Sequence, residues 1–120
     1  METAVYLRFY MHEGQHLHHK PLYEWLLELA RSMGIPGGSA FRAIAGYGRH
    51  RRLHEEHFFE LAGDLPVEVV FTVRGDQERE LLDRLRQEGV SIPVLRSEVS
   101  IGRSDDPRDG SDSSGERSCT

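Results

Sequence analysis

The sequence predicts an α+β domain of the ferredoxin-like type, βαββαβ, in which two helices cover one face of a four-stranded antiparallel sheet. Apolar and polar residues alternate along residues 4–11, and an apolar stripe at helical spacing follows Pro21. A second strand, helix and strand follow Pro66. Because strand–helix–strand crossovers are right-handed, two of them in one sheet place both helices on the same face.

The first half of the chain is predicted to form a strand, a helix and a weaker strand. The buried face of the strand at residues 4–11 is expected to carry Val5, Leu7, Phe9 and Met11. The polar stretch HEGQHLHHK that follows is expected to be a loop. Pro21 suits the first turn of a helix that Gly34 ends, and the weaker strand is expected at residues 39–47.

The second half repeats this order. The run VEVVFTV after Pro66 is the strongest strand signal in the chain, since β-branched and aromatic residues favour strands. Asp76 is expected to cap a helix over residues 77–88, which Gly89 ends. The last strand is predicted at residues 91–101, with a proline near its start.

Composition divides the chain into a folded part, residues 1–101, and a polar tail, residues 102–120. The tail, GRSDDPRDGSDSSGERSCT, has no aliphatic or aromatic side chain. It has no apolar area to bury against the entropy cost of ordering, so we expect it to be disordered. Its five acids and three arginines contribute −2 to the formal net charge of −5.

Several classes of protein are disfavoured by the same composition. The apolar runs are too short for a membrane-spanning helix of about 20 residues, so no direct membrane insertion is expected. The acidic balance disfavours binding to nucleic acid. Cys119 is the single cysteine, which excludes a disulfide framework within the chain and a cysteine-based zinc site. We expect a cytoplasmic protein.

The sheet face opposite the helices is predicted to be partly apolar. Tyr6, Tyr10 and Val70 fall on it by strand alternation. A sheet face that is partly apolar and not packed against the chain's own helices commonly packs against another subunit, so we expect the chain to form an oligomer.

Five short motifs resemble a known family. They are PLYE at residues 21–24, FRAIAGYG at 41–48, GYGRH at 46–50, Arg52-Leu53-His54, and DLPVEVV at 64–70. In this order and spacing they resemble the PII-like uncharacterised family called domain-of-unknown-function family 190, and more distantly the PII nitrogen-regulatory signalling proteins. The resemblance covers about residues 5–100.

The resemblance implies a ferredoxin-like homotrimer with the 46–57 loop near clefts between subunits. PII proteins bind adenine nucleotides in those clefts, and their loop signals the bound ligand to a partner, for which a membrane transporter or channel is one candidate. This chain departs from PII in two places: its loop is shorter, and residues 87–91 lack the Gly- and Lys-rich loop that grips phosphate in PII.

A basic, glycine-containing stretch is the main candidate site for an anionic ligand. Its residues are Gly46, Tyr47, Gly48, Arg49, Arg51 and Arg52. Glycines permit close approach of a ligand to the backbone, and arginines present planar forks that suit phosphate oxygens. Glu13 and Lys20 are expected at the start of the same cleft. Alternatively, the arginines pair with the nearby acids Glu55, Glu56 and Glu60.

A histidine-rich stretch is the second candidate site. Its members are His16, His18 and His19, and His54 of the 46–57 loop is a candidate fourth ligand. Imidazole binds zinc, copper and nickel, so a metal-sensing or metal-tolerance trimer is the alternative function. A solvated polar loop and a pH sensor remain open. No nucleophile, base and orienting group can be assigned, so we expect a regulatory protein and not an enzyme.

Overall fold

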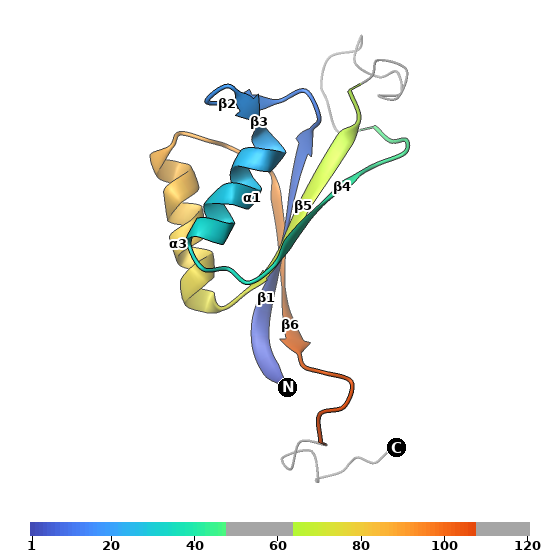
Figure 1. Cartoon of the computed structure of the whole chain (residues 1–120), viewed down its shortest axis with the longest axis vertical. Coiled ribbons are helices and arrows are strands. Elements are labelled where there is room, and N and C mark those ends of the chain that lie inside the picture. Colours follow the sequence, from blue (N-terminus) through green and yellow to red (C-terminus); the bar gives the residue numbers. More distant parts are fainter. Residues whose placement is uncertain (48–63, 108–120) are drawn as a thin grey trace.

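The computed structural model describes residues 1–47 and 64–107, and it confirms the predicted ferredoxin-like fold. One four-stranded antiparallel sheet has the order β4-β5-β1-β6. Both helices lie on one face of this sheet (Figure 1). The strands are β1 (Glu2–His12), β4 (Gly38–Arg42), β5 (Pro66–Val73) and β6 (Val94–Ile101), and the helices are α1 (Leu22–Ser32) and α3 (Gly75–Gln87).

The core lies between the sheet and the helices, as the alternation along the strands predicts. Antiparallel pairing sets Phe9 opposite Val69 and Leu7 opposite Phe71, which places their side chains on the helix side. The rings of Phe9 and Phe71 meet edge to face, with centroids 6.1 Å apart. Both helices complete the core with side chains at helical spacing: Leu22, Leu26, Leu29 and Ala30 of α1, and Leu81 and Leu85 of α3.

Three predicted boundaries were wrong. The strand expected at residues 39–47 ends at Arg42, because its partner strand begins at Pro66, which has no N–H to continue the ladder. The N-cap of α3 is Arg74, whose backbone N–H donates to Gln77 Oε1, so Asp76 lies in the first turn instead. The last strand, predicted to begin at residue 91, begins at Val94, directly after Pro93.

The stretch predicted to be a loop before α1 contains a small hairpin of β2 (His16–Leu17) and β3 (Lys20–Pro21). Its two connecting residues, His18 and His19, have φ of 52° and 67°. Two consecutive left-handed residues are typical of the type I′ hairpin turn. The sequence did not predict this turn because Asn and Gly are its usual residues and both are absent here.

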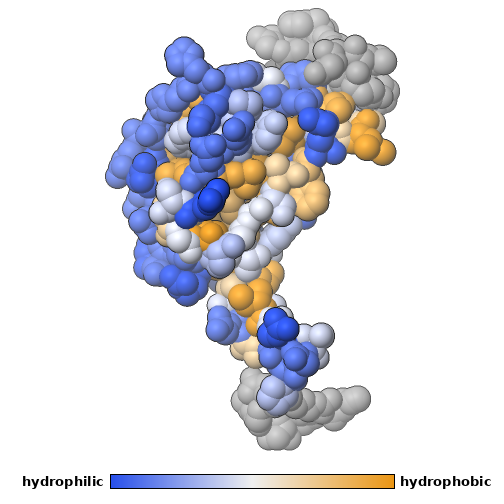
Figure 2. Space-filling view, viewed as in Figure 1, coloured by the Kyte–Doolittle hydropathy of each residue, from blue (hydrophilic) through white to orange (hydrophobic). Residues whose placement is uncertain are grey.

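The sheet extends beyond the helices and leaves apolar side chains exposed. Figure 1 shows that β1 and β6 extend beyond the helices, at the end of the sheet where the N-terminus lies. Figure 2 shows hydrophobic residues, in orange, on this extension and near the far end of β4. The exposed apolar residues include Phe41, Ile44, Leu95 and Ile101. Within the described residues, no helix is long and apolar enough to cross a membrane.

Candidate functional site

The candidate site lies at the end of the sheet where the 46–57 segment leaves it. There β1 and β4 end and β5 begins, so the described residues that precede and follow that segment in the chain lie near the end of β1. Two backbone hydrogen bonds hold them. Ala43 N–H donates to Pro66 O at 2.8 Å, and Glu13 N–H donates to Leu65 O at 2.9 Å.

Asp64 adds a side-chain link at the same place. Gly14 N–H donates to Asp64 Oδ1 at 2.8 Å. A Cβ atom at position 14 would lie 3.2 Å from this oxygen, which is tighter than ordinary contact. Gly14 therefore allows the carboxylate to approach the backbone closely, and the exit of β1 is attached to the residue that precedes β5.

The two charged residues predicted at the cleft start both have charged partners. Glu13 Oε2 lies 2.6 Å from Arg42 Nη2. Lys20 Nζ donates to Glu28 Oε1 at 2.6 Å, and this hydrogen bond raises the pKa of Lys20. Arg42 was not predicted as a site residue. The sequence motif FRAIAGYG contains it, but only the sheet order brings it to Glu13.

The basic stretch itself is only partly described. Gly46 and Tyr47 belong to the described residues, and Tyr47 is 78% exposed at the end of the segment that follows β4. The remaining members of the predicted anion site lie outside the described residues: Gly48, Arg49, Arg51 and Arg52. Their role stays a prediction from sequence.

The histidines of the hairpin contact protein groups. His16 Nδ1 lies 2.8 Å from Gly14 O, and since a carbonyl only accepts, this nitrogen carries the proton and donates. His18 Nε2 lies 2.9 Å from Glu88 Oε1, with the His18 ring 6.4 Å from the ring of Trp25. Over residues 1–47 and 64–107, no three metal-ligating side chains gather, and His54 lies outside these ranges.

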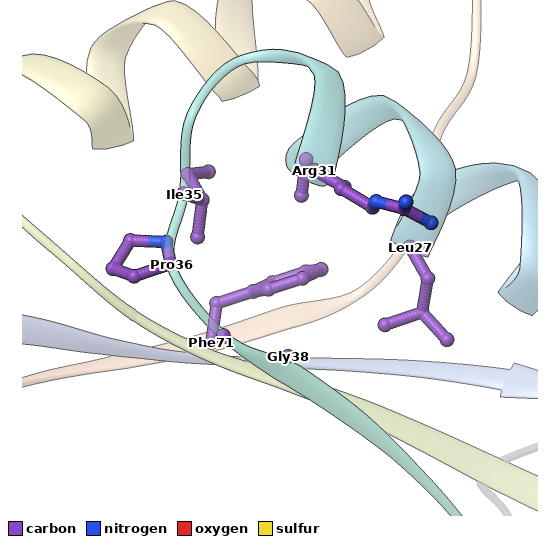
Figure 3. Close-up of a pocket in the computed structure, with 8 residues that line it drawn as sticks. Leu27, Arg31, Ile35, Pro36, Gly38 and Phe71 are labelled. Atoms are coloured by element: carbon purple, nitrogen blue, oxygen red, sulfur yellow. The ribbon is translucent and has the colours of Figure 1, made fainter.

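A cavity of about 320 Å³ lies between α1 and β4, away from this end of the sheet. Figure 3 shows Phe71 beneath it, Leu27 and Arg31 on the α1 side, and Ile35 and Pro36 on the other side. Gly37 and Gly38 contribute no side chain to its wall. The cavity is lined mainly by apolar groups, and Arg31 is its one charged lining residue among those the structure describes.

The open face of the sheet carries a polar and aromatic strip at its centre. Arg8 lies over the ring of Tyr6, with its guanidinium carbon 5.5 Å from the ring centroid. Arg8 Nε is buried, has no hydrogen-bond partner within the described part of the chain, and lies 3.5 Å from Glu68 Oε1. Hydrogen bonding to Tyr6 and then Tyr10 raises the pKa of Arg8.

Several known proteins are similar to this chain in sequence. A UPF0166 protein of Aquifex aeolicus (strain VF5) is 34% identical over 80 residues, which cover 67% of this chain and 76% of that protein. A UPF0166 protein of Methanocaldococcus jannaschii is 31% identical over 67 residues, which cover 56% of this chain and 61% of the relative.

Solved structures similar to this chain include CPII from Thiomonas intermedia K12. The structure of CPII bound to ADP and bicarbonate matches with a TM-score of 0.55 and 24% identity, covering 85% of this chain and 91% of CPII. The apo form of CPII, a nitrogen regulatory PII-like protein, matches with a TM-score of 0.53 and 20% identity, and the match covers 85% of this chain and 95% of that CPII chain. At this identity the likeness shows a shared fold, and it agrees with the resemblance that the sequence motifs indicate.

The family comparison covers most of the chain. The family DUF190, described as "Uncharacterized ACR", matches residues 4–100. This range begins in β1, ends one residue before the end of β6, and includes both ends of the 46–57 segment. The chain therefore belongs to the DUF190 family.

Proposed function

We propose that this protein is a PII-like regulatory protein that acts by binding and not by catalysis. In this proposal it assembles as a homotrimer and binds a small anionic effector at clefts between subunits, with an adenine nucleotide as the leading candidate. Ligand binding orders the 46–57 segment, which changes its affinity for a partner protein, for example a membrane transporter or channel.

The observation that carries the proposal is the shared fold with CPII along 91% of the CPII chain. CPII structures contain ADP with bicarbonate, and ADP with AMP and bicarbonate. The stretch that contains Gly46, Gly48 and Arg49 follows β4 at one end of the sheet, and the described residues on either side of it are held there by hydrogen bonds that Ala43, Glu13 and Gly14 donate. A segment held at its base and rich in arginine suits ligand-dependent ordering.

The open sheet face supports the homotrimer. Arg8 Nε is buried there without a hydrogen-bond partner in the described structure, and Phe41 and Leu95 are exposed on the same face. Arg8 and Glu68 form an ion pair on this face, so these two charges offset each other where a second copy would pack. Covering this face with another copy removes apolar surface from water.

The test combines ligand binding with mass measurement on the full chain. We expect ADP to raise the melting temperature, because a ligand that binds only the folded state stabilises it, and we expect light scattering to give three times the chain mass of 13.7 kDa. Arg49→Ala with Arg52→Ala should abolish the ADP shift and leave the trimer intact. Arg79→Ala, at an exposed position of α3, is the matched control.

Zinc, copper and nickel belong in the same screen. Stabilisation by a metal that is lost in the variant with alanine at His16, His18 and His19 would assign the ligand site to the histidines. A protein that responds to neither ADP nor metal would contradict the ligand-binding proposal, and a monomer in solution would contradict the assembly.

A further inference from the structure

We infer that Arg42 is a further anion-binding residue of this protein, and that Glu13 competes with the ligand for it. An anion at the base of the 46–57 segment replaces Glu13 as the partner of Arg42. The inference rests on the proposed function and deepens it: the ligand class is a nucleoside phosphate whose phosphate oxygens contact the Arg42 guanidinium.

Arg42 lies at the start of the chain segment that carries the predicted anion site. Arg42 is the last residue of β4, four positions before Gly46. Its side chain is 55% exposed, whereas that of Glu13 is 31% exposed. A guanidinium presents its N–H donors as a planar fork, and carboxylate and phosphate both offer paired oxygens to that fork. The present partner of Arg42 therefore shows that the guanidinium can accommodate an anion in this position.

The exchange has a small energetic cost. Arg42 is exposed and Glu13 is partly exposed, and ion pairs in contact with water contribute little to stability because water and salt screen them. A phosphate group carries more charge than one carboxylate and makes stronger charge-assisted hydrogen bonds. The ligand consequently gains more at Arg42 than the protein loses at Glu13.

This ion pair joins the ends of two strands, whereas several other exposed pairs join near neighbours in the chain. Arg74–Asp76 and Arg86–Asp83 join residues two and three positions apart, so breaking them separates nothing. Glu13 and Arg42 instead join the ends of β1 and β4, which lie on either side of β5 in the sheet. Exchange at Arg42 removes a link between the exit of β1 and the start of the 46–57 segment, while the backbone bond from Glu13 N–H to Leu65 O is retained.

The decisive experiment is calorimetric titration of ADP into the wild type and two variants of the full chain. Glu13→Gln removes the competing charge, so we expect ADP to bind about two- to fivefold more tightly. Arg42→Ala removes the charge-assisted contact, so we expect binding to weaken about tenfold or more. Arg74→Ala with Asp76→Asn, at the opposite end of β5, should leave the affinity within twofold and is the matched control.

Each outcome separates this inference from the proposed function. If Glu13→Gln binds ADP more weakly than the wild type or equally well, Glu13 does not compete with the ligand. That result would mean that Glu13 positions Arg42 or contacts the ligand itself. Unchanged binding in Arg42→Ala, with loss in Arg49→Ala and Arg52→Ala, would overturn the inference and leave the proposed function standing. The change in melting temperature on adding pyrophosphate is measured in parallel for the wild type and Glu13→Gln. This second probe covers the case in which the wild type does not bind ADP. If pyrophosphate then shifts both proteins equally, or shifts neither, the inference is overturned.

Discussion

At the scale of single residues, close packing between a glycine and an aromatic ring shapes the edge of the core. Gly38 begins β4 and lies opposite Phe71 of β5. A Cβ atom at position 38 would lie 2.5 Å from Phe71 Cε1, a distance that real Cβ atoms do not adopt. The ring fills the space that a side chain would take, so the residue type at position 38 follows from its neighbour across the sheet.

Gly38→Ala should lower the free energy of unfolding by about 1–3 kcal/mol, because Phe71 or the edge strand must move to admit the methyl group. Gly37→Ala is the matched control. A Cβ there meets nothing within 4 Å, so stability should stay the same or rise by up to about 1 kcal/mol. Urea denaturation of both variants measures this. Equal effects at the two positions would contradict the packing argument.

At the scale of elements, the small β2–β3 hairpin is connected to both helices by charged side chains. Lys20 on β3 donates to Glu28 of α1, and His18 in the turn contacts Glu88, the C-cap residue of α3. The hairpin is too short to be stable by itself, since two-stranded hairpins are marginal in water. These contacts with the helices accordingly help to hold two left-handed histidines in place.

The Lys20–Glu28 pair should make stability depend on alkaline pH. The hydrogen bond to Glu28 raises the pKa of Lys20 in the folded state, so its contribution is present below the unfolded value of about 10.4 and is lost as pH rises through the folded pKa. The difference in melting temperature between wild type and Glu28→Gln should therefore shrink above about pH 10. Glu80→Gln, on α3, should show no such trend and is the control. A constant difference from pH 7 to 11 would contradict the assignment.

At the scale of the whole molecule, the sheet has one face covered by its own helices and one face that is open. Apolar side chains remain exposed on β4 and β6, and β1 and β6 continue beyond the helices (Figures 1 and 2). The chain builds its core on one side of the sheet and leaves a half-buried strip of Tyr6, Arg8 and Tyr10 on the other, and the proposed trimer would cover this open face.

Ile101→Asp should convert the proposed trimer to a monomer, because strand alternation places this residue on the open face and a carboxylate there would be buried without a partner. Val94→Asp is the matched control. Val94 has nearly the same exposure, 42% against 41%, but points to the helix side of β6. Light scattering measures the mass of each. Loss of the trimer in both variants, or in neither, would contradict the assignment of the interface.

Local patterns in the sequence predicted most of the fold. Alternation along β1 and β5 and helical spacing along α1 arise from neighbouring residues, so they can be recognised without the structure. The errors had two causes. Pro66, distant in sequence from β4, ends the pairing of that strand at Arg42. The His18–His19 turn and the Arg74 N-cap are local features that their residue types do not indicate.

The sequence by itself determined the fold class and the DUF190 resemblance, because both depend on residue types at regular or fixed spacing along the chain. Only the tertiary structure decided which charges meet. Glu13 and Lys20 were both predicted at the start of a cleft, and the structure gives them separate partners: Glu13 pairs with Arg42 across the sheet and Lys20 with Glu28 of α1. Such partners follow from strand order and helix placement, which bring together residues that no local pattern relates.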